Sequence, residues 1–228
     1  MPTDSASQGM STPEHATHAH TGAWVAGVLR ARIADGQLLP GAKLSEQALS
    51  ESLSVSRNTL REAFTVLAGE AVVTRIPNRG VFVASPGPEE IREIYRVRRM
   101  IEPAAALWST DLDLEGLEGI VGQARAAKAS GDVVAMANAN QEFHQALVRA
   151  SGSVQLQGLM RQVLAQMRLV FHAMVDAPDF HTHYVEPNAE FVSMLRAGDR
   201  RGAAEHLRAY LDRAEAELLG HLAARARP

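Results

Sequence analysis

The stretch Leu53-Ser54-Val55-Ser56-Arg57-Asn58-Thr59-Leu60-Arg61-Glu62-Ala63 decides the fold of the N-terminal part of the chain. Ser56 suits a helix N-cap, and the helix that follows has one apolar side, formed by Leu60, Ala63, Phe64 and Leu67. A shorter helix with Ser45 as its N-cap precedes it, and Ser54-Val55 is a tight connection between the two. Two short helices joined so closely predict a helix-turn-helix.

The segments on either side extend this motif. Upstream, a helical pattern ends at Gly36 and has its apolar residues at Val25, Val28, Leu29 and Ile33. Downstream, the strand-like runs 72–76 and 81–83 are joined by the turn Pro77-Asn78-Arg79-Gly80. Three helices followed by a hairpin predict a winged helix-turn-helix, whose second helix of the pair enters the major groove of DNA.

The outer side of that second helix carries the residue types that read bases. Arg57, Asn58 and Arg61 share one face. Arginine bonds guanine through two acceptors, and asparagine bonds adenine in the same way. The alternative is a merely solvated helix face, which the ordered pattern over residues 25–83 disfavours.

Hydroxyl and glycine positions nearby suit the DNA backbone. The side chains of Ser56 and Thr59 lie near the helix start, where hydroxyls and the helix N-terminus attract phosphate oxygens. At the tip of the hairpin, Gly80 allows close approach of the backbone. Arg79 beside it can reach the DNA backbone or the minor groove.

Composition divides the chain into four segments. Residues 1–20 are expected to be a disordered tail, whose histidines could bind a stray metal ion: His15, His18 and His20. A DNA-binding domain over 21–84 and a linker over 85–88 follow. Residues 89–228 predict an antiparallel bundle of about six helices, near 89–109, 113–130, 132–150, 153–176, 184–197 and 199–224. The fold is therefore expected to be mainly α.

Charge and composition favour a cytoplasmic protein with one basic module. The chain has 228 residues, no Cys and a net charge of −3, which excludes disulfides and a cysteine nucleophile. Residues 21–84 carry seven basic and five acidic side chains, a net charge of +2. Neither a secretory signal nor an apolar run long enough for a membrane helix is visible.

Enzyme chemistry finds no support in the sequence. The paired Glu-x-x-His motifs of di-metal bundles are absent, and His144 with Glu142 has the wrong spacing. There is also no Gly-x-Ser-x-Gly elbow and no glycine-rich phosphate loop. The sequence therefore indicates a DNA-binding protein rather than an enzyme.

Residues 25–83 resemble the DNA-binding domain of GntR-type bacterial transcription regulators. The resemblance rests on residues 39–46, on residues 53–63 and on Pro77-Asn78-Arg79-Gly80-Val81, in order and at family spacing. It implies DNA contacts by Ser56, Arg57, Asn58, Thr59, Arg61, Arg79 and Gly80. Relatives often use an arginine in the helix before the recognition helix, and this chain has Gln47 there, which leaves a polar contact without that charge.

The helical remainder resembles the FCD effector-binding domain of the FadR-type branch. The matching stretches are residues 95–103, 142–147 and 195–199. Many relatives hold a divalent metal there through one Asp and three His. The resemblance places those ligands at Asn140, His144, Asn188 and Tyr210, so only His144 of the set is kept. No metal cofactor is therefore predicted, although zinc, nickel or manganese could still bind through other histidines: His172, His181, His183 and His206.

The same residues suggest a polar effector site without a metal. Asn140, His144, Asn188 and Tyr210 would line a polar cavity, and Arg98 resembles the basic residue that relatives direct at an acidic effector. The alternative for Arg98 is an ion pair with Glu102, one helical turn away. We expect a small organic acid as the effector.

We expect a transcription regulator that is controlled by a ligand and acts as a repressor, since repression is the commoner outcome among relatives. A single winged helix offers a small interface, so a homodimer on a palindromic operator is expected. Two alternatives stay open: a DNA-binding protein without ligand control, and a metal-dependent sensor with a rewired site.

Overall fold

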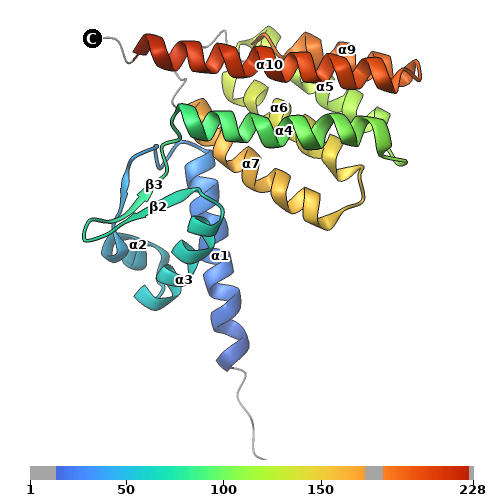
Figure 1. Ribbon diagram of the computed structural model, residues 1–228. Coiled ribbons are helices and arrows are strands. Elements are labelled where there is room, and N and C mark those ends of the chain that lie inside the picture. The colour runs from blue at the N-terminus through green and yellow to red at the C-terminus, as the bar shows by residue number, and fades with distance from the viewer. Residues whose placement is uncertain (1–13, 173–181, 226–228) are drawn as a thin grey trace, which may run out of the picture.

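The computed structural model describes residues 14–172 and 182–225, which form two packed domains (Figure 1). The N-terminal domain contains α1 (Glu14–Ala34), β1 (Lys43–Leu44), α2 (Glu46–Leu53), α3 (Arg57–Gly69), β2 (Val73–Ile76) and β3 (Gly80–Val83). Helix α1 begins earlier than the boundary expected at residue 21, so residues 14–20 are helical and not part of a disordered tail. Residues 1–13 lie outside the described residues.

Both helices of the predicted helix-turn-helix begin at their expected caps. The Ser45 side chain accepts a hydrogen bond from the Ala48 amide, and the Ser56 side chain accepts one from the Thr59 amide. Ser54 between the helices is left-handed, with φ 53°, which makes the turn tight. The core of this domain joins the apolar faces of α1 and α3 through fully buried side chains: Val25, Leu29, Leu60, Phe64 and Leu67.

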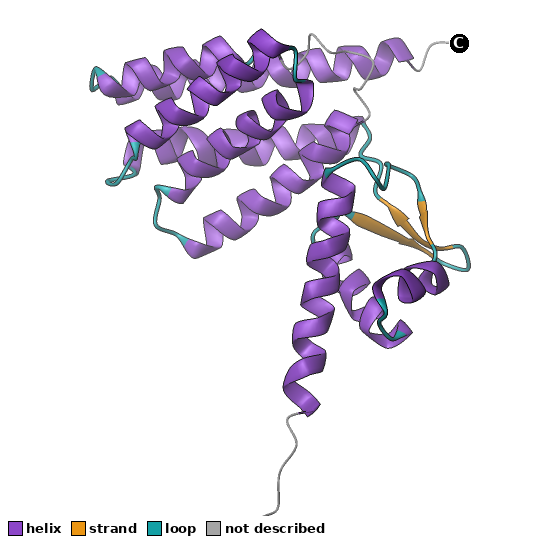
Figure 2. Cartoon of the chain, turned by 180° about the vertical axis from the view of Figure 1, so that it is seen from behind, coloured by secondary structure: helices purple, strands orange, loops and turns teal. Residues whose placement is uncertain are grey.

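The strands, drawn in orange in Figure 2, form a small antiparallel sheet. Their order is β1-β3-β2. Thr74 and Lys43 both pair with Phe82 on the central strand. The predicted hairpin is therefore confirmed, and the two-residue strand β1 is an addition that sequence patterning did not reveal. Positive φ angles at Asn78 and Gly80, 60° and 108°, form the turn at the hairpin tip.

The C-terminal domain is helical throughout its described residues. Its elements lie close to the predicted ranges: α4 (Pro88–Trp108), α5 (Leu114–Ser130), α6 (Val133–Arg149), α7 (Val154–His172), α9 (Val185–Arg196) and α10 (Arg200–Arg225). Helix α10 packs along α4, and α5 packs against both α6 and α9 (Figure 1). None of the described helices is both long and apolar enough to cross a membrane.

Helix α7 belongs to both domains. Most of its buried side chains pack in the bundle, but Leu169 is fully buried within the core of the N-terminal domain. His172 Nε2 lies 2.8 Å from the carbonyl oxygen of Ala34, at the end of α1. The side-chain amide of Gln166 donates to the Glu70 carbonyl oxygen. The two domains are thus joined by direct packing as well as by the linker.

Candidate nucleic-acid interface and buried polar network

Helix α3 presents the predicted base-reading side chains to solvent. Arg57, Asn58 and Arg61 are all exposed, while Leu60, Ala63 and Phe64 of the same helix are fully buried. This division follows from the helical period, because residues three and four positions apart share a face, and Asn58 and Arg57 lie three and four positions before Arg61. Ser56, also exposed, caps the helix at its N-terminal end. The structure therefore brings four of the predicted DNA-contacting residues onto one surface.

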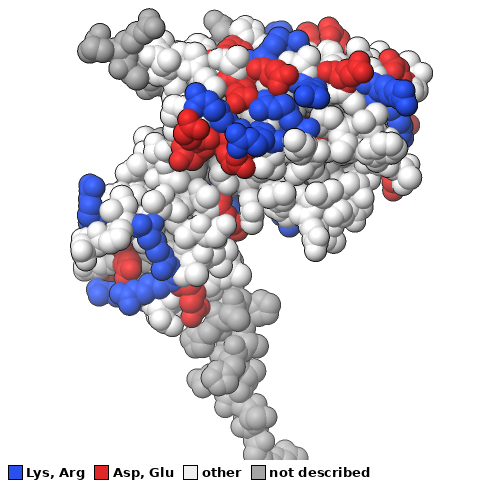
Figure 3. Space-filling view, in the orientation of Figure 1, with Lys and Arg blue, Asp and Glu red and all other residues white. Residues whose placement is uncertain are grey.

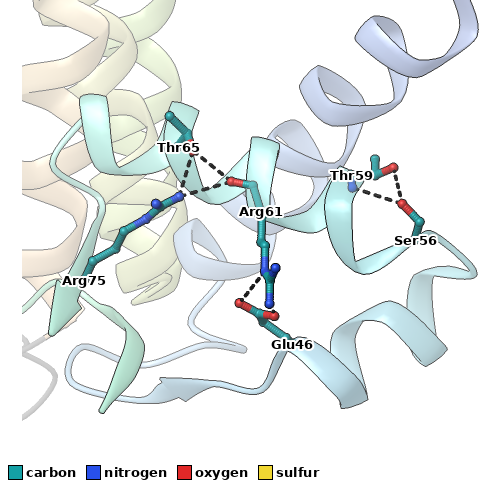
Figure 4. A network of polar contacts seen from close by, with 6 residues as sticks. All are labelled: Glu46, Ser56, Thr59, Arg61, Thr65 and Arg75. Atoms are coloured by element: carbon teal, nitrogen blue, oxygen red, sulfur yellow. Dashed lines mark hydrogen bonds and ion pairs between the residues drawn. The ribbon is translucent and has the colours of Figure 1, made fainter. Parts of the chain in front are cut away.

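Arg61 is held in place from two sides (Figure 4). Its Nε lies 3.1 Å from an oxygen of Glu46 on α2. Arg75 on β2 donates to the Arg61 carbonyl oxygen at 3.1 Å and to the Thr65 hydroxyl at 2.7 Å. These bonds connect the helix-turn-helix to the wing. Only Nε of the Arg61 guanidinium is bonded to Glu46, so the same side chain that is predicted to read a base is also held by a carboxylate.

The wing adds a second basic position beside α3. Arg79 is exposed, and its guanidinium carbon lies 5.7 Å from the centre of the Phe82 ring. Gly80 has φ 108°, a conformation that side chains rarely adopt, and an added Cβ there would lie 3.4 Å from the Lys43 side chain. Lysine and arginine gather along the outer edge of this domain (Figure 3).

Two of the predicted contacts sit differently from the rest. Thr59 is only 5% exposed, and its hydroxyl is bonded to that of Ser56 at 2.9 Å, so it does not lie on the exposed face. It is buried because it occupies the side of α3 that faces the domain core. Gln47 is exposed, and its amide donates to the Glu51 carboxylate one turn on.

Sequence reasoning missed three residues of this surface. Arg75 and Lys43 are exposed cations on the sheet, and Glu46 is the partner of Arg61. Arg75 lies two residues after the buried Val73 on β2, so strand period alone would have placed it on the inner face and gives no sign of its exposure. The pairing of Glu46 with Arg61 depends on the crossing of two helices and leaves no local signal.

The predicted effector residues meet inside the bundle. Arg98 of α4, Asn140 and His144 of α6, Asn188 of α9 and Tyr210 of α10 lie in one chain of hydrogen bonds. Glu102 was not in the predicted set, and it links Arg98 to His144 at the beginning of this chain of hydrogen bonds. Arg98 Nε lies 2.6 Å from one Glu102 oxygen, and His144 Nδ1 lies 2.7 Å from the other.

The chain continues from His144 through neutral groups. The Tyr210 hydroxyl oxygen lies 3.1 Å from His144 Nε2 and 3.3 Å from Asn140 Oδ1. The Asn188 amide donates to the same Asn140 oxygen at 3.0 Å. These side chains were predicted to line a polar cavity, and the structure shows that they also bond one another directly. The ion pair of Arg98 with Glu102, left open as an alternative, is present.

Charge in this network is concentrated on Arg98 and Glu102, both of which are at most 2% exposed. Burial alone would raise the pKa of the Glu102 carboxyl, but the neighbouring Arg98 and His144 lower it to about 2. Burial would likewise lower the pKa of Arg98, and Glu102 reverses this and raises it. Both groups are therefore charged across the whole physiological range.

Burial lowers the pKa of His144, which outweighs the attraction of the Glu102 carboxylate. In the neutral form, Nδ1–H donates to Glu102 and Nε2 accepts from the Tyr210 hydroxyl. A protonated His144 would donate to both partners, and Tyr210 would then turn its proton toward Asn140. The protonation state of one imidazole thus sets the direction of the remaining hydrogen bonds.

Comparison with known proteins agrees with both parts of this geometry. Residues 22–83 match the family of bacterial regulatory proteins named gntR, and residues 93–213 match the FCD domain. The chain belongs to the GntR family of transcriptional regulators with an FCD domain.

Solved and curated relatives cover most of the chain. A crystal structure of a transcriptional regulator GntR from Rhodococcus sp. RHA1 is 40% identical, with a TM-score of 0.82 over 89% of this chain and 98% of the other. The regulator McbR of Escherichia coli K12 is 26% identical over 76% of this chain and 81% of its own. The gluconate operon repressor of Bacillus subtilis 168 is 37% identical over 43% of this chain and 40% of its own.

The positions that the resemblance assigns to metal ligands are bonded to one another in this GntR regulator. Asn140 Oδ1 accepts from Asn188, and burial raises the pKa of the Tyr210 hydroxyl, so the phenol stays protonated. Within the described residues, no three His, Asp or Glu side chains gather in a metal-binding arrangement. Neutral amides and a phenol do not replace a carboxylate and two imidazoles.

The other histidines considered as substitute ligands have partners of their own. His206 Nε2 lies 3.0 Å from the Pro187 carbonyl oxygen, and His183 Nδ1 lies 3.0 Å from a Glu217 oxygen. His172 contacts the Ala34 carbonyl oxygen between the domains. His181 lies outside the described residues, as do the side chains of the tail histidines His15, His18 and His20.

The lowered pKa of His144 predicts a loss of stability in mild acid. Unfolded His144 takes up a proton near pH 6.5, whereas the native state resists it, so the unfolded state binds more protons below that pH. The contribution is complete above pH 6.5 and decreases as the pH falls. Urea unfolding of wild type and of His144→Gln between pH 8 and about pH 5 measures this, since the variant should show the smaller decrease.

Proposed function

We propose that this GntR regulator is a repressor that binds a palindromic operator as a homodimer and is released by a small organic acid. The DNA-binding part rests on the exposed triplet Arg57, Asn58 and Arg61 at the start of a helix capped by Ser56. One such helix and one wing form a small interface. Two copies related by a two-fold axis would double it and would match a palindromic site.

Relatives support the sign of regulation and the class of effector. The gluconate operon repressor is joined by the galactonate operon repressor of Escherichia coli K12, which is 28% identical over 61% of this chain and 71% of its own. Both relatives are named as repressors, and both names contain a carboxylate, gluconate or galactonate. A carboxylate is also the ligand that a buried guanidinium binds best.

The observation that carries ligand control is an unsatisfied donor in the bundle. Arg98 Nη2 is buried and has no hydrogen-bond partner among the described residues, although Arg98 Nε is paired with Glu102. A buried donor without a partner is costly, so a ligand oxygen that accepts from it would be favoured. A ligand that exchanged hydrogen bonds in this network would shift the four helices that contribute to it. Such a shift could change the placement of the DNA-binding domain.

Replacement of Arg57 or Arg61 by alanine is expected to weaken specific DNA binding by about 1–3 kcal/mol if that arginine reads a guanine. Fluorescence anisotropy with operator and random-sequence duplexes, at fixed salt, measures the change. Arg201→Ala is the matched control, because it removes one exposed arginine from α10. Unchanged operator affinity would remove that arginine from the interface.

Arg61→Ala also frees the Glu46 carboxylate beside the DNA. Glu46→Gln in the same background separates the lost base contact from the added repulsion. If the double variant regains operator affinity in full, Arg61 acts only by neutralising Glu46.

Arg98→Lys is expected to keep operator affinity and to blunt release by the effector, because lysine keeps the charge but lacks Nη2. A thermal-shift screen of carboxylate metabolites, with and without chelator, identifies the ligand and tests metal dependence together. The hit is then used for operator release from wild type and variant. Normal release from the variant would assign Arg98 a purely structural role, and stabilisation that chelator abolishes would restore the metal-dependent alternative.

A further inference from the structure

A cavity of about 480 Å³ lies between the two domains, away from the buried network. Its walls come from α1, from the segment that joins α3 to β2, and from α6 and α7. Helix α6 contributes Gln141 and Gln145, each one residue after Asn140 and His144 of the network. A molecule in this cavity would therefore touch both domains, and one of its walls is the helix that also carries the effector residues.

The charge of the cavity is positive. Three arginines and one glutamate line it: Arg30, Arg161, Arg168 and Glu70. Arg30 binds Glu70 through two hydrogen bonds, of 2.7 and 2.9 Å, so these two charges cancel within the wall. The positive charges of Arg161 and Arg168 remain for a ligand.

Arg168 is poorly satisfied for a guanidinium in this position. Its Nη2 donates to the side chain of Asn138, but its Nε is buried and has no hydrogen-bond partner among the described residues. Burial lowers the pKa of Arg168, and the attraction of Asp35 offsets only part of this effect. Arg168 as a whole is partly buried, and a buried donor without a partner, such as its Nε, is costly unless an acceptor reaches it.

Arg161 is exposed on the same helix, two turns before Arg168. Gln145 and Gln162 also line the cavity, and their amides can donate to or accept from the uncharged part of a ligand. Two guanidiniums with adjacent amides form a surface that suits carboxylate or phosphate oxygens, which guanidinium groups bind with paired hydrogen bonds.

We propose that this interdomain cavity binds a small anion through Arg161 and Arg168, at a site separate from the network around His144. The shared chemistry is a carboxylate or phosphate group on a molecule small enough for the cavity. Because its walls belong to both domains, the bound anion favours one relative placement of the winged helix and the bundle. The site gives the regulator a second input that acts on domain orientation.

Isothermal titration of the full chain, without DNA and in low-salt buffer, tests the proposal with two probes, citrate and inorganic pyrophosphate. The variants are Arg161→Gln and Arg168→Gln, and the matched control is Arg201→Gln on α10. Wild type and the control should bind at least one probe with equal affinity. Each cavity variant should bind that probe with an affinity that is lower by a factor of about ten or more.

The two probes distinguish the chemical sources. Binding of citrate alone assigns a carboxylate ligand, binding of pyrophosphate alone assigns a phosphate ligand, and binding of both supports the shared chemistry. No binding by wild type, or equal binding by all four proteins, overturns the proposal. Arg161 is exposed, so its variant remains decisive if Arg168→Gln fails to fold. Because no DNA or effector is present, the result is independent of operator release.

Discussion

Replacing Glu102 by glutamine is expected to lower the free energy of unfolding by about 3–5 kcal/mol. The substitution is nearly isosteric, so little packing is lost. It removes the only carboxylate bonded to Arg98 and His144 among the described residues, and leaves the Arg98 cation, 2% exposed, without a countercharge. Urea unfolding at pH 7, followed by circular dichroism, measures the loss.

Two further variants make the Glu102 prediction specific. Glu118→Gln breaks the exposed pair of Glu118 with Arg196 and should cost about 1 kcal/mol or less. The double variant Arg98→Met with Glu102→Gln removes both buried charges and should recover part of the loss. Equal costs for Glu102→Gln and Glu118→Gln would show that the buried pair contributes no more than a surface pair.

Acid acts on the same carboxylate. With its pKa lowered to about 2 from 4.5, Glu102 contributes stability that is present above pH 4.5 and is lost as the pH falls toward 2. His144 loses its contribution earlier, below pH 6.5. The two groups therefore lose their contributions in successive pH ranges, His144 first and Glu102 at lower pH, and both losses destabilise the native state in acid.

The parts of the fold that were predicted from sequence are those with a regular local signal. The caps Ser45 and Ser56, the apolar period of α3 and the turn at Asn78 each follow from neighbouring residues, and the structure has them. Strand β1 is too short to show a period, and it exists because Lys43 pairs with Phe82 on a strand far along the chain.

Most residues of the buried network were predicted from the sequence, but the hydrogen bonds among them were not. The resemblance to relatives placed Asn140, His144, Asn188 and Tyr210 together, and three helices, α6, α9 and α10, bring them together. The role of Glu102 as the link between Arg98 and His144 depends on how α4 faces α6. Neither helix contains that information alone, which is why these direct contacts were not predicted from the sequence.

Leu169 shows most clearly what one-dimensional patterning cannot supply. Its spacing on α7 is that of any bundle core residue, and the sequence gives no sign that it packs in the other domain. The structure places its fully buried side chain against the N-terminal core, with Ala165 beside it. One of the contacts between the domains is therefore made by a residue that looks ordinary in the sequence.

Leu169→Ala is expected to cost about 2–5 kcal/mol and to separate the unfolding of the two domains. The lost methyl groups leave a cavity in the N-terminal core, at the point where α7 joins it. The chain has two tryptophans, Trp24 on α1 and Trp108 on α4, so each domain carries one fluorescent reporter. Urea unfolding of Trp24→Phe and Trp108→Phe backgrounds follows the domains one at a time.

In the wild-type background the two reporters should give coincident transitions, since α7 contributes to both cores. With Leu169→Ala, the Trp24 transition should move to lower urea than the Trp108 transition. Leu159→Ala on the same helix is the control, because Leu159 is 41% exposed and its truncation should leave both transitions nearly unchanged. Coincident transitions in Leu169→Ala would mean that the remaining contacts, such as that of His172 with Ala34, suffice to couple the domains. Split transitions would instead show that the packing of Leu169 is needed for the two domains to unfold together.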